Sequence, residues 1–172
     1  TSDFSRTRKT QRLLFKKRLA VDIVPFGGVA EKGDFIEWPP DRSFKMSVAG
    51  FLECYQHVVQ VKISDKPELA INVVSLAGLT ILKLISWDEI SDRRQKDASD
   101  LFFIIQNYLD AGNLERLFEK ASDIVDSSDY NYESGSARLL GRDISRIAFS
   151  TTKAKLIQIL KDAGMRVSIF SK

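Results

Sequence analysis

Short apolar runs separated by turn residues fill residues 11–75. The runs 13–15 and 20–24 flank Lys16-Lys17-Arg18, and Pro25 with Gly27-Gly28 follows the second run. This spacing predicts a hairpin followed by a break. Further strands are expected at 35–38, 58–63 and 69–74, and a short helix around 47–57.

The second half of the chain instead follows a period of about 3.6 residues. Within 97–109, for example, Leu101, Ile104, Ile105 and Tyr108 recur at helical spacing. Helices are expected at 76–87, 97–109, 114–125, 137–149 and 153–163. Strands followed by a run of helices indicate an α+β protein, with a sheet domain over 1–75 and a helical domain over 76–172.

Composition narrows the class of protein. The chain has 172 residues, of which 44% are hydrophobic and 28% are charged, as in folded globular domains. A single cysteine, Cys54, and a single histidine, His57, exclude a disulfide framework and multi-cysteine zinc sites, and we interpret both as structural. No apolar run approaches the roughly 20 residues that span a bilayer, and no secretory signal is present. We therefore expect no membrane partner and a cytoplasmic protein.

Positive charge is concentrated at the beginning of the chain. Residues 1–20 contain seven Lys or Arg and one Asp, so they carry +6, and the other 152 residues sum to −3 within the total of +3. This segment predicts either contact with a phosphate-bearing partner or a solvated, positively charged strand and turn.

Asp22 is unusual because aspartate is depleted in strands, yet it lies within the β-branched run 20–24. On a strand it would share a face with Ala20 and Val24. A carboxylate there could hold a metal or act as a base. The alternative is an exposed position on an edge strand.

Lys83 lies in the middle of the apolar helix expected at 76–87, so it must either reach solvent or meet an anion such as phosphate. Asp97 can cap the next helix or orient Lys83, and Arg93 or Arg94 can contact phosphate. Three arginines form a basic stripe at intervals of four residues that could follow an RNA backbone, or simply be solvated: Arg138, Arg142 and Arg146.

Several of these segments, in this order, resemble one known family. They are Val21-Asp22-Ile23-Val24-Pro25-Phe26-Gly27-Gly28, Trp38-Pro39-Pro40-Asp41, Met46-Ser47-Val48, Ser75-Leu76-Ala77-Gly78-Leu79 with Leu82-Lys83-Leu84, Arg94, Lys96-Asp97-Ala98-Ser99-Asp100-Leu101, and Ala137-Arg138-Leu139-Leu140-Gly141-Arg142-Asp143. Over residues 12–150 the chain is similar to predicted bacterial nucleotidyltransferases related to the AbiEii abortive-infection toxins, within the DNA polymerase β-like superfamily.

The resemblance implies a mixed β-sheet of nucleotidyltransferase type followed by a C-terminal helical bundle. It also implies transfer of a nucleotide from NTP to an RNA or protein acceptor with two Mg²⁺ ions. Asp22 would be the third metal carboxylate, Lys83 would face the triphosphate, Asp97 would hold Lys83 or the site loop, and Arg94 would help to bind nucleotide. The setting would be a toxin–antitoxin or phage-defence module, with an antitoxin as a further partner.

One family feature is missing from residues 1–172. The family carries a Gly-Ser turn followed by an Asp-x-Asp pair before the strands at 13–24, and this sequence contains no such combined motif. Two of the three expected metal carboxylates are therefore missing, and we expect negligible transferase activity from this chain. The alternative is a non-catalytic relative that binds RNA or protein. If strands of the sheet are missing, an uncovered apolar edge or face would favour a homodimer.

Overall fold

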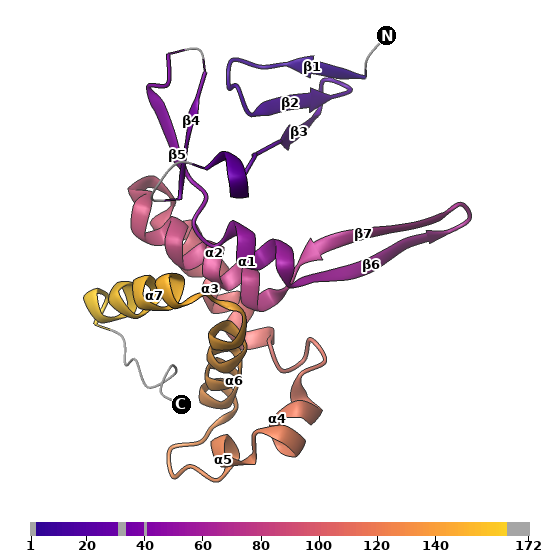
Figure 1. The fold of residues 1–172 in the computed structure, drawn as a ribbon. Coiled ribbons are helices and arrows are strands. Elements are labelled where there is room, and N and C mark those ends of the chain that lie inside the picture. The colour runs from indigo at the N-terminus through magenta and orange to yellow at the C-terminus, as the bar shows by residue number, and fades with distance from the viewer. Residues whose placement is uncertain (1–2, 31–33, 40, 165–172) are drawn as a thin grey trace. The chain divides into compact units, whose positions relative to one another are not determined.

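The computed structural model describes residues 3–30, 34–39 and 41–164 (Figure 1). The chain forms two compact units, Thr1–Leu52 and Glu53–Lys172, which are described separately below. The sequence placed the domain boundary later, after residue 75. Pro40, which is part of one family-like motif, and residues 165–172 of the predicted helical domain lie outside the described residues.

The first unit consists of two small antiparallel sheets. Strands β1 (Phe4–Arg6), β2 (Arg12–Phe15) and β3 (Leu19–Asp22) form one sheet in the order β1-β2-β3, and β4 (Phe35–Trp38) pairs with β5 (Phe44–Ser47) in the other. The predicted hairpin is present: Phe15 pairs with Leu19, and Lys16 and Lys17 turn the chain with φ of 48° and 57°. The break after the hairpin contains a 3₁₀ turn, η1 (Gly27–Val29).

The second unit contains one long hairpin and most of the helices. Part of α1 (Phe51–Gln56) leads into β6 (Val58–Asp65) and β7 (Glu68–Val74). The remaining elements are α2 (Leu76–Glu89), the 3₁₀ turn η2 (Ser91–Arg93), α3 (Arg94–Asn107), α4 (Leu114–Lys120), α5 (Ser122–Val125), α6 (Tyr132–Ile147) and α7 (Ser150–Asp162). None of the helices in the described ranges is both long and apolar enough to cross a bilayer.

Capping residues explain where two of the helices begin. Ser75 accepts a hydrogen bond from the Gly78 N–H (3.2 Å) and starts α2, as its position before the apolar run predicts. Asn131 and Ser134 form a capping box, so α6 begins five residues earlier than the expected 137. The helix expected at 114–125 is broken at Ala121, where φ is −147° and ψ is 36°.

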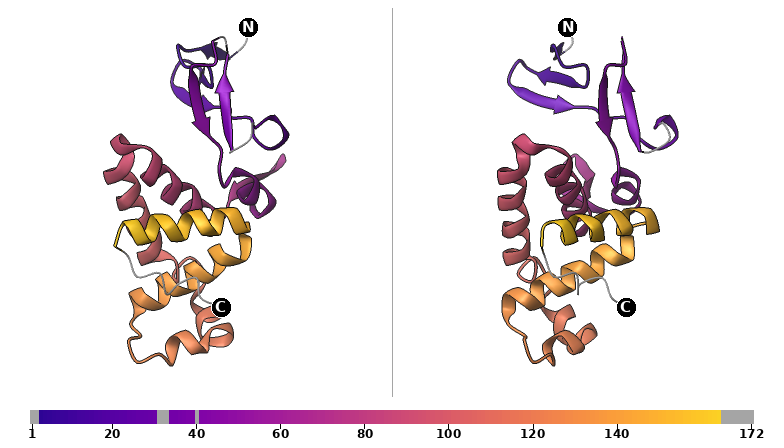
Figure 2. Two further views of the ribbon diagram at one scale, coloured as in Figure 1. Left: turned by 60° about the vertical axis from the view of Figure 1, so that its left-hand side comes forward. Right: turned by 90° about the vertical axis from the view of Figure 1, so that its left-hand side faces the viewer.

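The core of the second unit lies among its helices. Helix α2 contacts α3, α6 and α7 (Figure 2). Fully buried side chains include Ile81, Leu109, Leu117 and Leu156. Gly78 permits a close approach, because a Cβ there would lie 2.9 Å from Val74 Cγ2.

The α+β class is confirmed, but the expected single mixed sheet is wrong for the described residues. All strand pairs there are antiparallel and belong to three separate sheets. The physical reason is the length of the connections. Parallel neighbours need a crossover of about a dozen residues or more, whereas these paired strands are joined by short turns.

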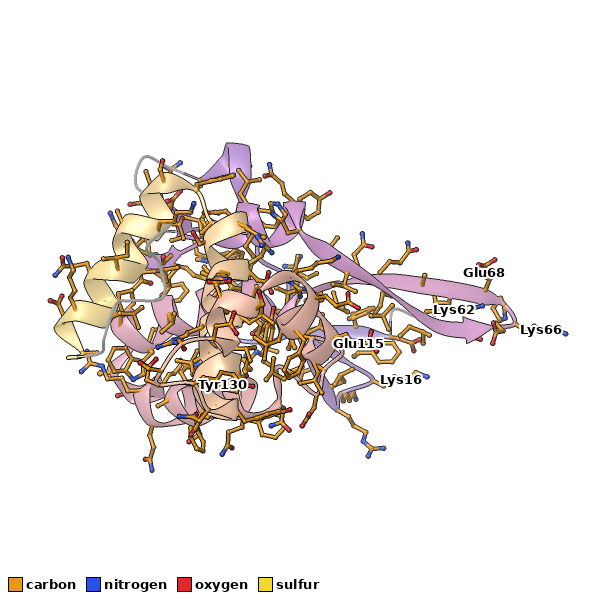
Figure 3. The ribbon with its side chains drawn as sticks, turned by 90° about the horizontal axis from the view of Figure 1, so that it is seen from below. Lys16, Lys62, Lys66, Glu68, Glu115 and Tyr130 are labelled. Atoms are coloured by element: carbon orange, nitrogen blue, oxygen red, sulfur yellow. The ribbon has the colours of Figure 1, made fainter. Side chains whose placement is uncertain are left out.

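The β6–β7 hairpin extends away from the helices of its unit (Figures 1 and 3). Val59 pairs with Val73 and Val61 pairs with Ile71, so one face of the hairpin is apolar. Val59, Val61 and Ile71 are 49%, 37% and 44% exposed. This apolar face is the kind of uncovered surface that the sequence associated with a homodimer.

Candidate functional site

Helices α2 and α3 bring Lys83 and Asp97 together. The Lys83 Nζ donates to Asp97 Oδ1 at 2.8 Å and to Asp100 Oδ2 at 2.5 Å. The Ser86 hydroxyl donates to the other Asp97 oxygen, Oδ2, at 2.7 Å. We call these four residues the Lys83 cluster. The turn η2 makes the cluster possible, because it reverses the chain between the two helices.

Burial and charge fix the protonation states in the Lys83 cluster. Asp97 is only 1% exposed. Its burial acts to raise the pKa, but hydrogen bonds from Lys83 and Ser86 outweigh burial and hold the pKa of Asp97 below its ordinary value. Burial likewise acts to lower the pKa of Lys83, but the hydrogen bonds that Lys83 donates to Asp100 and Asp97 outweigh burial and raise that pKa. The cluster is therefore one cation held by two carboxylates.

Arg94 is the first residue of α3 and contacts the last turn of α2. The Nε atom donates to the Trp87 carbonyl at 3.2 Å, and a terminal nitrogen donates to the Asp88 carbonyl at 3.4 Å. The guanidinium also lies 5.7 Å from the centre of the Trp87 ring. Arg94 thus stabilises the C-terminus of α2, where carbonyl groups lack helical partners.

Asp22 belongs to the first unit and ends β3. It lies opposite Arg12 in the β2–β3 register, and both of its oxygens accept hydrogen bonds from the Arg12 guanidinium at 2.6 Å. This hydrogen bond and the Asp22 charge raise the pKa of Arg12. No group of three or more His, Cys, Asp or Glu that could hold a metal is found within residues 3–30, 34–39 and 41–164.

The three arginines on α6 are each bound to a carboxylate. Arg138 donates to Asp129 at 2.6 Å, Arg142 is paired with Asp123, and Arg146 donates to Asp143 at 3.1 Å. Two of these acids lie in α5 and in the loop after it. Inspection of the α6 face alone therefore overestimates its free positive charge.

Two acidic side chains in the second unit, Asp143 and Glu53, have partners that the sequence did not predict. Asp143 on α6 accepts from Tyr108 Oη at 2.5 Å and from Arg116 at 2.7 Å, which joins α6 to α3 and α4. Burial is the main cause that raises the pKa of Tyr108 above its ordinary value. Glu53, 3% exposed, is bound by the Thr152 hydroxyl. The partners are too far apart in sequence for any spacing rule to have paired them.

Cys54 and His57 each contact a backbone carbonyl oxygen, as expected of structural residues. The Cys54 thiol donates to the Gly78 carbonyl at 3.3 Å, and burial raises its pKa to about 12. The His57 Nδ1 lies 2.9 Å from the Glu53 carbonyl oxygen. A thiol with so high a pKa is a poor nucleophile at neutral pH.

Comparisons with known proteins do not identify the class. The sequence matches no protein-family model, and neither the curated proteins nor the solved structures give a significant match.

Proposed function

We propose that this chain is part of a nucleotidyltransferase-family protein in which Lys83 contacts the triphosphate of the substrate. The complete protein would transfer a nucleotide from NTP to an RNA or protein acceptor, as a toxin or phage-defence component controlled by an antitoxin. The observation that carries the proposal is the contact between Lys83 and Asp97. It joins two segments on which the family resemblance rests, and it matches the role that the resemblance gives to Asp97.

The chemistry of Lys83 is compatible with this role. An ammonium has three N–H donors, and the described residues supply two acceptors, on Asp97 and Asp100. The Lys83 side chain is 22% exposed, so its third donor is available to a phosphate oxygen. Asp97 is better suited to positioning than to proton transfer, because both of its oxygens are already hydrogen-bonded.

In the proposed function, Mg²⁺ binds together with the nucleotide. Arg12 binds both oxygens of Asp22, and no metal cluster is found in the described part of the chain. The described residues therefore do not fit a resident Mg²⁺ on their own. In this proposal the ion arrives with the nucleotide, so the substrate is Mg·NTP.

Affinity labelling tests the role of Lys83 directly. Adenosine diphosphopyridoxal carries an aldehyde where the terminal phosphates of ATP would lie, and borohydride fixes it to a nearby lysine. We expect peptide mapping to find the label on Lys83 and Mg·ATP to protect that site. Labelling spread over exposed lysines, or no protection by any of the four Mg·NTP complexes, would contradict the proposal.

Calorimetric titration with Mg·NTP provides the matched comparison. Lys83→Met should weaken binding about tenfold or more, which is the range of one charge-assisted hydrogen bond. Lys96→Met removes the same charge from an exposed position on α3 and should leave binding unchanged. Equal binding by both variants would refute the assignment of Lys83.

The alternative function is a non-catalytic relative that binds RNA or protein. The charge of +6 on residues 1–20 favours it. The labelling experiment separates the two functions, because a non-catalytic binding module need not hold a nucleotide triphosphate at Lys83.

A further inference from the structure

A pocket of about 700 Å³ lies within the first unit, and its lining includes no residue of the Lys83 cluster. Its basic side is formed by β1, the β1–β2 turn and the start of β2. Residues after β3, together with Trp38 on β4, supply its apolar side. The volume falls in the range typical of sites for small molecules.

The basic side carries three cations that lack an acceptor among the described residues. Arg6, Arg8 and Lys9 all line the pocket, and all three are exposed. Arg12 also lines it, but its guanidinium is bound by Asp22. In this respect the pocket differs from the stripe on α6, where each arginine has a carboxylate partner.

Hydrogen bonds fix the turn that holds these cations. The Thr7 hydroxyl accepts from the Lys9 N–H at 3.1 Å and donates to the Arg12 carbonyl at 3.0 Å. The Arg12 N–H in turn donates to the Lys9 carbonyl at 3.0 Å. A turn that is ordered before binding loses less entropy when it contacts a ligand.

The apolar side is unusually open. Ile23 is 59% exposed, and Trp38 is also part of the pocket lining. The indole Nε1 of Trp38 is buried and has no hydrogen-bond partner, the single such side-chain nitrogen or oxygen in the part of the chain that the structure describes. An aromatic ring with an unused N–H, in the same lining as cations that have no acceptor among the described residues, suits a ligand that is both flat and anionic.

We propose that this pocket binds single-stranded nucleic acid. Phosphates contact Arg6, Arg8 and Lys9, and one unstacked base lies against Ile23 and the Trp38 ring. Trp38 adjusts on binding so that its N–H reaches an oxygen of the base or backbone. A single strand fits better than a duplex, because paired bases are stacked inside the helix and cannot enter a pocket. The site goes beyond the proposed function, since it uses no residue of the Lys83 cluster.

Tryptophan fluorescence gives a specific readout. The chain has two tryptophans, so Trp87→Phe leaves Trp38 as the sole emitter. In this background we expect the 12-mer U12 to quench Trp38 on binding. A blunt 12-base-pair duplex, although its charge density is higher than that of the single strand, is expected to bind more weakly and to leave the emission unchanged.

Two triple variants, each of which removes three positive charges, distinguish binding at the pocket from a general effect of charge on affinity. The pocket triple carries Arg6→Gln, Arg8→Gln and Lys9→Gln. The turn triple removes the same charge from the exposed β2–β3 turn, outside the pocket, and carries Lys16→Gln, Lys17→Gln and Arg18→Gln. The pocket triple should weaken binding by about tenfold or more and reduce the slope of log K against log salt by about 2, at about 0.7 for each phosphate contact. The turn triple should change affinity less than about threefold, because its charges act only at long range.

Ile23→Asp tests the apolar side of the pocket and leaves all of its cations in place. Because Ile23 is exposed, the substitution is compatible with folding. It should abolish quenching, with the circular dichroism spectrum unchanged. Equal binding of U12 and the corresponding DNA 12-mer would support recognition of the phosphates and an unstacked base, which single-stranded RNA and DNA have in common. Equal losses in the two triples, stronger binding of the duplex, or full quenching in Ile23→Asp would each overturn the proposal.

Discussion

Asp97→Asn is the substitution that tests the Lys83 cluster most directly. Asparagine has nearly the same shape as aspartate but no charge. At this 1% exposed position it leaves the Lys83 ammonium with a single carboxylate, that of Asp100. It also requires the Ser86 hydroxyl to find a new acceptor or to accept from the amide. The substitution therefore changes charge and hydrogen bonding while it creates almost no cavity.

The expected cost follows from the contacts. Breaking a fully buried ion pair costs about 3–5 kcal/mol. Lys83 is 22% exposed and keeps Asp100, so solvent and the second carboxylate reduce the cost to about 2 kcal/mol. For a unit of this size, 2 kcal/mol corresponds to a decrease in Tm of about 8 °C. Asp92→Asn, at an exposed position of η2, is the control and should stay within about 0.5 kcal/mol of the wild type.

The pH dependence gives a second, independent readout. The pKa of Asp97 is lower in the folded chain than its unfolded value of about 3.9. Its contribution is therefore complete above that unfolded value and is lost as pH falls through the lower, folded pKa. In Asp97→Asn this part of the acid destabilisation is absent, so the difference in stability between variant and wild type should shrink below about pH 4.

Urea unfolding followed by circular dichroism, between pH 2.5 and pH 7, measures both effects. A variant as stable as the wild type at pH 7 would refute the ion-pair argument. A difference in stability that stays constant down to pH 2.5 would show that Asp97 does not titrate as the geometry requires. Either result would also weaken the proposal that Asp97 positions Lys83 for a phosphate.

Three further changes test other parts of the molecule. Gly78→Ala places a Cβ 2.9 Å from Val74 Cγ2 and should destabilise the chain by about 1–3 kcal/mol in urea unfolding, whereas Gly28→Ala has open space and should be neutral. The hairpin face should drive self-association, and Val61→Lys with Ile71→Lys should give a monomer in sedimentation equilibrium; a monomeric wild type would contradict this. The chain incubated with labelled NTP, Mg²⁺ and RNA or protein acceptors should transfer no label, so robust transfer would disprove our interpretation of the missing Asp-x-Asp motif.

Local signals in the sequence were sufficient to predict most of the helices and strands. Turn residues and β-branched runs predicted the hairpin before Pro25, and the helical period predicted α2, α3 and α7 to within a few residues. Strands β1 and β5 were missed. Each contains only three or four residues, too few for a period to stand out, and each is paired with a neighbouring strand. Pairing of this kind depends on tertiary context more than on propensity.

The site was predictable only where one family-like motif contacts another. The resemblance suggested that Asp97 holds Lys83, and the two residues are in contact across 14 positions of sequence. The role of Ser86 could not be foreseen, because a serine inside an apolar helix usually bonds within its own turn. The arginines of α6 were judged along one helix face, whereas the partners of Arg138 and Arg142 lie in the loop after α5 and in α5. Side-chain pairs between different elements depend on how those elements pack, and they leave no periodic pattern in the sequence.

The distribution of charge argues that the two units meet anions in different ways. In the second unit the Lys83 cluster has one cation and two carboxylates, so it carries a net negative charge and repels a bare triphosphate. A phosphate can approach the third N–H of Lys83 only if it brings its own divalent cation to offset this charge, and the proposed substrate Mg·NTP meets this requirement. In the first unit, Arg6, Arg8 and Lys9 have no carboxylate partner among the described residues, so the polyanion of a nucleic acid can bind there without a metal. Omitting Mg²⁺ should therefore abolish nucleotide binding at Lys83 and leave the binding of U12 unchanged. Loss of both, or of neither, would show that the two proposals do not describe separate sites.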